Sequence, residues 1–223
     1  MKNFVFLYPI DKIFDIEIEN GAVSLDRISG EIGYGVLEKF PEQLKPRRKI
    51  IEKEVMRRKK LIFGPIYAVM LNGCINARYR KKGFGINYVI FDDSEVSDII
   101  KLRKEDRVIR AGISEDAHYI DGEYPNEGYI LNQLKLNGRS ELVVGGFHVT
   151  DCVDKLAEKA YERGIDVLVD EDLTNYFESL IREKGFMPNS KPSFNSYRFI
   201  TSRFRREVQK KRKTKPWLYK FDG

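Results

Sequence analysis

The stretch LVVGGFHVTDCVDKLAEKAYERGIDVLVDED, from Leu142 to Asp172, decides the fold. Two short apolar runs enclose a charged segment whose apolar residues recur with helical spacing. Gly164 suits the left-handed cap that ends such a helix. The pattern predicts a strand, a helix and a second strand, with Cys152 where the first strand meets the helix. The apolar face of the helix is formed by Val153, Leu156, Ala157, Ala160 and Tyr161.

The same alternation extends towards the N-terminus. Apolar runs of strand length and segments of helical pattern follow one another along the chain. Strands alternating with helices at this spacing are typical of a parallel sheet with helices on both faces. We therefore predict an α/β fold, a three-layer α/β/α sandwich around a mainly parallel sheet. Strands are expected at residues 3–8, 86–93, 107–111, 141–147 and 165–172, and helices at 45–60, 66–82, 126–138 and 152–164.

The expected position of Cys152 has chemical consequences. A helix N-terminus presents unpaired backbone N–H groups and a partial positive charge, which stabilise a thiolate. The same N–H groups are suited to hold the oxyanion that forms when a thiolate attacks a carbonyl. The alternative interpretation is that Cys152 is a small apolar residue packed between strand and helix, since unbonded cysteines are often buried.

This segment resembles the isochorismatase-like cysteine hydrolases. Residues 146–153, GFHVTDCV, and the small and apolar residues after them are similar to the family's G-x-x-T-x-x-C-V…A…A…G…V signature. DRVIR at 106–110 resembles the strand that carries the family's catalytic lysine, and FVFLYPIDKIFD at 4–15 resembles its first strand. The resemblance covers most of residues 1–15 and 65–175, and only the cysteine segment is specific.

The resemblance implies a triad that cleaves an amide or a related bond. Asp11 takes the place of the general base, Arg110 that of the orienting cation and Cys152 that of the nucleophile. The family has lysine where this chain has Arg110, and arginine keeps its charge and cannot shuttle a proton. A catalytically altered site therefore remains an alternative. The residues expected to contact the substrate are His148, Val149, Asp15 and His118.

No metal or cofactor is expected. Nicotinamidases of the same family bind a metal through an Asp-x-His motif and a further histidine after the second strand. The corresponding segment here, FDDSEVSD at residues 91–98, contains no histidine, and the two histidines of the chain lie elsewhere. Asp92 and Asp93 are therefore interpreted as solvated acids at a strand end.

The net charge of +6 is concentrated near the C-terminus. Residues 198–220 hold ten lysines and arginines, interleaved with aromatic residues such as Trp217, whereas the rest of the chain is close to neutral. This composition is typical of nucleic-acid binding, but also of an arm whose aromatic rings dock on the core or on a neighbouring subunit. We expect an α/β domain at residues 1–196, with an insertion at about 16–64, and a basic aromatic arm at 197–223.

The composition limits the classes of function. At 223 residues and 42% hydrophobic content the chain suits one large domain, and no apolar run approaches the 18 residues that a membrane span needs. The apolar N-terminus is broken at Pro9 and Asp11, which favours a first strand over a signal peptide. Two distant cysteines fit a reducing cytoplasm better than a disulfide framework.

We therefore expect a cytoplasmic cysteine hydrolase that acts on a small-molecule substrate, an amide or a related compound. The family resemblance implies a homo-oligomer. The alternative is a catalytically degenerate protein of the same fold that acts by binding, with nucleic acid, held by the basic arm, as one candidate partner.

Overall fold

The computed structural model describes residues 1–15, 57, 61, 64–65, 67–69, 71–136, 139–147, 152–174 and 215–217. Residues 11–15 and 71–78 are helical. Apart from residue 57, which is helical, the expected helix at 45–60 lies outside the described residues, and so do nearly all of the expected insertion and most of the arm. The elements are β1 (Lys2–Leu7), η2 (Arg80–Lys82), β2 (Gly85–Ile90), β3 (Arg107–Arg110), α4 (Glu115–Tyr119), α5 (Glu127–Leu134), β4 (Glu141–Gly146), α6 (Cys152–Glu162) and β5 (Asp166–Thr174).

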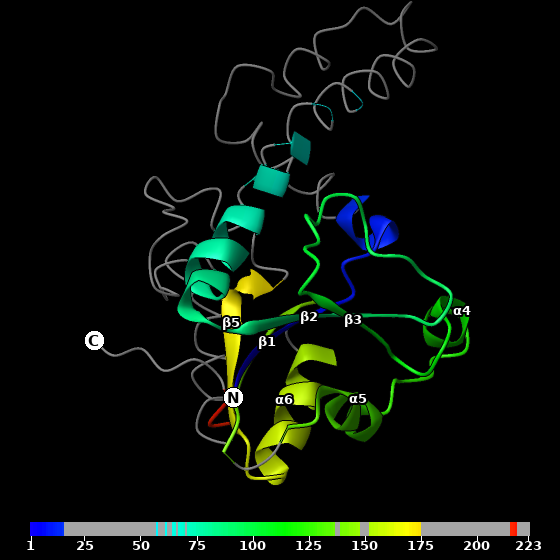
Figure 1. The fold of residues 1–223 in the computed structure, drawn as a ribbon. Coiled ribbons are helices and arrows are strands. Elements are labelled where there is room, and N and C mark those ends of the chain that lie inside the picture. The colour runs from blue at the N-terminus through cyan, green and yellow to red at the C-terminus, as the bar shows by residue number, and fades with distance from the viewer. Residues whose placement is uncertain are drawn as a thin grey trace, which may run out of the picture.

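The five strands form one parallel sheet in the order β3-β2-β1-β4-β5 (Figure 1). This confirms the predicted α/β fold with a mainly parallel sheet. The central strand β1 is buried from Asn3 to Leu7, as its apolar sequence indicates. After β1 the chain adds β2 and β3 on one side, and it later returns to add β4 and β5 on the other side. The order of strands therefore reverses between β1 and β4, where open α/β sheets tend to bind ligands at the carboxyl ends of their strands.

Helical segments pack on both faces of the sheet (Figure 1). On one face, α6 lies against β4 and β5 through the apolar stripe expected from the sequence, which is buried at Val153, Leu156, Ala157 and Ala160. On the other face, the segment at 71–79 reaches β1, where the ring of Tyr79 stacks on that of Phe4 with centroids 4.0 Å apart. The core thus fills both sides of β1.

Gly146 allows β4 to end close against β1. Its φ is +105°, and a Cβ at this position would lie 2.3 Å from the carbonyl oxygen of Leu7 and 2.4 Å from its nitrogen. Only glycine combines this conformation with so close an approach. The carboxyl ends of the two central strands are therefore held together directly before the segment that leads to Cys152.

One aromatic residue of the expected arm docks on the domain. Trp217 is buried, and its Nε1 donates to Oδ1 of Asp154 in the first turn of α6 at 2.7 Å. Lys215 pairs with the same carboxylate. The carbonyl of Trp217 accepts a hydrogen bond from Val169 N at 2.9 Å, so this segment also binds the backbone of β5. For Trp217, docking on the core is the interpretation that holds.

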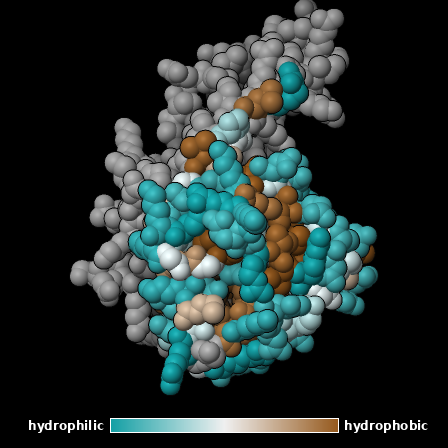
Figure 2. All heavy atoms as spheres, viewed as in Figure 1, coloured by the Kyte–Doolittle hydropathy of each residue, from teal (hydrophilic) through white to brown (hydrophobic). Residues whose placement is uncertain are grey.

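The surface shown in Figure 2 is largely hydrophilic, with an apolar strip near its middle. Exposed apolar side chains in the described part of the chain include Val108 on the edge strand β3 and Leu102 in the loop before it. No helix among the described residues is long and apolar enough to cross a bilayer.

Candidate active site at the carboxyl edge of the sheet

Cys152 lies where the sequence predicts it, at the first residue of α6. Its side chain is almost buried, and the thiol forms a hydrogen bond with the hydroxyl of Tyr8. Tyr8 directly follows β1, so the two side chains come from either side of the point where the strand order reverses. Tyr8 is thus the described residue that reaches the sulfur from the end of the central strand.

The backbone of Tyr8 is held in an unusual conformation. Its φ is +56°, the left-handed region, which costs a bulky residue roughly 1–2 kcal/mol. Its N–H donates to the carbonyl of Val89 at 2.7 Å, and its carbonyl accepts from Ile10 N at 2.8 Å. The ring stacks on Phe91 with centroids 4.5 Å apart and planes inclined by 8°. These contacts fix the direction in which the hydroxyl points.

The tyrosines near the sulfur are held in their neutral form. Burial, followed by the charges of Cys152, Glu127 and Tyr119 and by the hydrogen bond with Cys152, raises the pKa of Tyr8 well above its usual value. Burial, followed by Glu115 and Cys152, raises the pKa of Tyr119 to about 12. Both phenols therefore remain hydrogen-bond donors throughout the neutral pH range.

Helix α4 covers this edge of the sheet, in a segment for which the sequence predicts neither a helix nor a strand. The hydroxyl of Ser114 accepts from Ala117 N at the start of the helix, and Oδ1 of Asp93 accepts from Glu115 N at 2.8 Å. Glu115 in turn binds Lys12 at 2.6 Å, and the Lys12 ammonium lies 4.4 Å from the centre of the Tyr119 ring. These contacts join α4 to the helix at 11–15 and bring Tyr119 towards Cys152.

Arg110 lies at the same edge but is engaged with the backbone. Its guanidinium donates to the carbonyl oxygens of Phe91, Asp92 and Ser94, and it approaches Oε1 of Glu95 at 3.4 Å. Within the described part of the chain it makes no hydrogen bond or ion pair with Cys152 or Asp11. Its observed contacts hold the loop that follows β2.

The remaining expected site residues divide into three groups. Asp11 and Asp15 lie in the helix at 11–15 with exposed side chains, and neither makes a polar contact with Cys152 among the residues that the structure describes. His118 belongs to the aromatic group beside Cys152: its ring centre lies 6.3 Å from that of Tyr8 and 5.2 Å from that of Phe91, and its Nδ1 lies 2.7 Å from the carbonyl oxygen of Glu123. His148 and Val149 lie outside the described residues.

The structure therefore brings together Cys152, Tyr8, Tyr119 and His118, with Glu127 close enough to affect Tyr8. Sequence reasoning missed the two tyrosines and Glu127. The place of Tyr8 at the end of the first apolar run, next to Pro9, is a sequence signal that could have marked it as a site residue, but its aromatic ring favours a role in the core. The short segment 115–119 shows no periodicity that would have indicated a helix or placed Tyr119.

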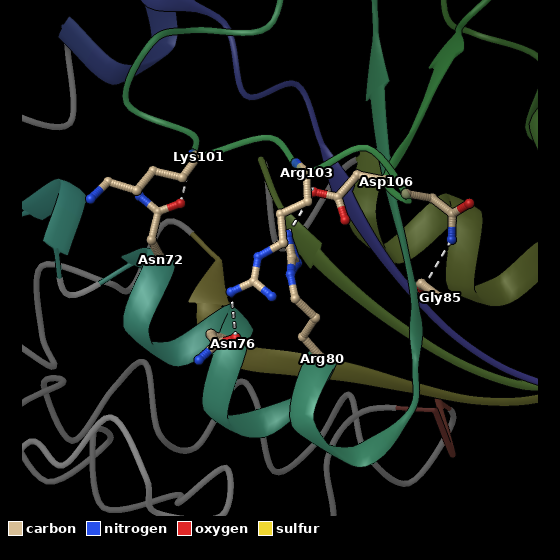
Figure 3. Close-up of polar contacts among 8 residues, drawn as sticks. Asn72, Asn76, Arg80, Gly85, Lys101, Arg103 and Asp106 are labelled. Atoms are coloured by element: carbon tan, nitrogen blue, oxygen red, sulfur yellow. Dashed lines mark hydrogen bonds and ion pairs between the residues drawn. The ribbon is translucent and has the colours of Figure 1, made fainter.

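A second polar cluster lies near the amino ends of β2 and β3 (Figure 3). Asn72, Asn76 and Arg80 are spaced by four residues, so they face the loop at 101–106 along one side of their helical segment. Nη2 of Arg80 donates to Oδ2 of Asp106 at 2.6 Å, and the same oxygen accepts from Arg103 N at 2.9 Å. This cluster fixes the loop that leads into β3.

Neither region gathers three metal-binding side chains: among the described residues no group of at least three His, Cys, Asp or Glu is placed to hold a metal ion. The two cysteines, Cys74 and Cys152, are both buried and form no disulfide. No protein-family model, no curated protein and no solved structure matches this chain.

Proposed function

We propose that this chain is a cysteine hydrolase with an isochorismatase-like three-layer α/β/α fold, which acts on a small amide or related substrate in a reducing cytoplasm. The observation that carries the proposal is the place of Cys152. It begins an eleven-residue helix at the carboxyl edge of a parallel sheet, beside the point where the strand order reverses, and it contacts a buried hydroxyl.

The chemistry follows from this place. The partial positive charge at the start of α6 and the Tyr8 hydroxyl both favour the thiolate form of Cys152. The thiolate attacks the carbonyl carbon, so that a C–S bond forms and the C–N bond breaks, and the departing amine takes a proton from water. The hydroxide that is left attacks the thioester, which releases the carboxylic acid and returns the sulfur as thiolate.

The roles expected for Asp11 and Arg110 are modified in the proposal. Asp11, at the start of the helix after β1, remains a candidate acceptor for the thiol proton because it lies three residues beyond Tyr8. Arg110 is assigned to the support of the loop at 91–95, since its guanidinium is bound by three carbonyl oxygens of that loop.

The experiment compares the two cysteines of the full chain. Iodoacetamide near pH 7, followed by mass spectrometry of the peptides, should label Cys152 at least about tenfold faster than Cys74, because only Cys152 begins a helix beside a hydroxyl donor. With 4-nitrophenyl acetate, wild type and Cys74→Ser should both release nitrophenol in a burst, and Cys152→Ser should not. Equally slow labelling of both thiols, without a burst, would exclude a cysteine hydrolase.

A second candidate is a catalytically degenerate binding protein on the same fold. It is favoured by the contacts of Arg110 and by the exposed position of Asp11, because neither side chain binds Cys152 within the described residues. The burial of Trp217 removes one aromatic residue from the set that could stack on nucleic-acid bases. A salt-dependent gel shift of labelled RNA, lost when residues 210–213 (KKRK) become alanine, would support this candidate.

A further inference from the structure

We infer that Tyr8 is the residue that positions the sulfur of Cys152 and stabilises its anion, as a neutral hydroxyl donor. The inference rests on the proposed function for its part in catalysis. The effect on the sulfur does not depend on catalysis: the hydrogen bond between Tyr8 and Cys152 makes the thiolate more stable than it would be without the hydroxyl.

The chemistry of the Tyr8 hydroxyl and of the Cys152 sulfur decides whether their hydrogen bond favours the thiol or the thiolate. The hydroxyl belongs to a buried side chain, and a buried phenol normally requires a hydrogen-bond acceptor. A neutral thiol is a weak acceptor, whereas a hydrogen bond to a charged acceptor is about twice as strong as a neutral one. The pair therefore gains more when the sulfur is ionised, which shifts the equilibrium of Cys152 towards the thiolate.

The conformation of Tyr8 indicates that this hydrogen bond is specified by the fold. The residue adopts a φ of +56°. Two main-chain hydrogen bonds hold it there, one from its N–H to the carbonyl of Val89 and one from Ile10 N to its own carbonyl. Stacking on Phe91 fixes the plane of the ring. A left-handed conformation is unfavourable for a tyrosine, and it directs the side chain from the end of β1 towards the start of α6.

The charged and polar groups near Tyr8 also bear on the ionisation of the sulfur. Glu127 at the start of α5 and the phenol of Tyr119 on α4 both act on Tyr8 or Cys152, and the ring of His118 lies behind Tyr8 and Phe91. A carboxylate near the site opposes ionisation of a thiol, and so does burial. The partial positive charge at the start of α6 and the Tyr8 hydroxyl act in the opposite direction.

Tyr8 is a positioning residue in this scheme, not an acid or a base. Its pKa is raised well above its usual value, first by burial and then by Cys152, so the phenol neither gives up nor takes a proton near neutral pH. The hydroxyl keeps the sulfur directed towards the carboxyl edge and remains bound to it before and after the attack.

The test is the pH dependence of Cys152 alkylation by iodoacetamide in the full chain with Cys74→Ser as background. Tyr8→Phe retains the stacked ring and removes only the hydroxyl, so it should raise the pH midpoint by about one unit or more, which slows alkylation at neutral pH roughly tenfold. The rate at high pH, where all the sulfur is ionised, should stay the same. Tyr119→Phe is the matched control and should shift the midpoint less, since Cys152 raises the pKa of Tyr119 through its charge and not through a hydrogen bond.

A rescue variant separates the hydroxyl's effect from a loss of structure. Tyr8→4-aminophenylalanine supplies an N–H donor on the same ring and should bring the midpoint back towards that of wild type, even if Tyr8→Phe folds poorly. Equal midpoints in wild type and folded Tyr8→Phe, or no recovery with the amino variant, would overturn the inference. If Tyr8→Phe has the midpoint of wild type and still turns over 4-nitrophenyl acetate, the inference on Tyr8 fails and the proposed hydrolase activity does not. If Tyr8→Phe shifts the midpoint but wild type shows no turnover, the proposed hydrolase activity fails and the inference on Tyr8 does not.

Discussion

Buried polar side chains find different kinds of partner at the two ends of the sheet. At the carboxyl edge, the Tyr8 hydroxyl and the Cys152 thiol share one hydrogen bond within a group of aromatic rings, and the backbone is strained. At the amino end, Arg80 and Asp106 form a tight ion pair supported by Arg103 (Figure 3). In the first arrangement a polarisable sulfur meets a neutral hydroxyl, and in the second arrangement two full charges neutralise each other.

The amino-end cluster is nevertheless incompletely satisfied. Nε and Nη1 of Arg80, Oδ1 of Asp106 and the hydroxyl of Tyr88 are buried and have no hydrogen-bond partner among the described residues. A buried polar group without a partner costs about 1–3 kcal/mol. The ion-pair cluster therefore holds the loop before β3 in place despite this cost, whereas at the carboxyl edge a contact between two neutral groups joins the end of β1 to the start of α6.

The largest expected effect comes from the glycine that closes the carboxyl edge. Gly146→Ala places a Cβ within 2.4 Å of two backbone atoms of Leu7 at a φ of +105°, so β1 and β4 must separate. We expect a loss of about 3–5 kcal/mol in the free energy of unfolding, measured by urea titration with circular dichroism. Gly83→Ala is the control: its φ is +77° but nothing lies within 4 Å of its Cβ, so it should lose only about 1 kcal/mol. Equal losses would show that the edge is not closed by this contact.

The sequence predicts the architecture better than it predicts the site. Strands and the longer helices follow from local patterns of apolar residues, and the five expected strands lie within a few residues of β1 to β5. Cys152 could be placed because a strand and a helix meet there. The conformation of Tyr8 depends on Val89, a distant residue, and the direction of Arg110 depends on carbonyl groups of the loop at 91–94. Such tertiary contacts leave no periodic signal.

An intermediate effect is expected from the ion pair at the amino end. Asp106→Ala leaves the guanidinium of Arg80, 90% buried, without its carboxylate, and should lower the free energy of unfolding by about 3 kcal/mol in the same titration. At the carboxyl edge the matched pair joins Arg110 to Glu95, whose side chain is 90% exposed. Glu95→Ala should therefore change stability by less than about 0.5 kcal/mol. A small loss for Asp106→Ala would mean that the cluster does not hold its loop.

The smallest effect at neutral pH is expected from Tyr88→Phe, which removes one of the buried groups that lack a described partner. Since no hydrogen bond is lost, the free energy of unfolding at pH 7 should change by no more than about 0.5 kcal/mol. Burial, and then the carboxylate of Asp106, raises the pKa of Tyr88 above its usual value of 10.0. Above about pH 10 the unfolded chain ionises this phenol before the folded protein does, which favours unfolding of wild type. Tyr88→Phe should therefore become the more stable protein as the pH rises from about 10, and urea titrations at pH 7 and pH 10.5 measure both quantities. A loss above about 1.5 kcal/mol at pH 7 would show that the hydroxyl does have a partner, and the two ends of the sheet would then differ less in how they satisfy their buried polar groups.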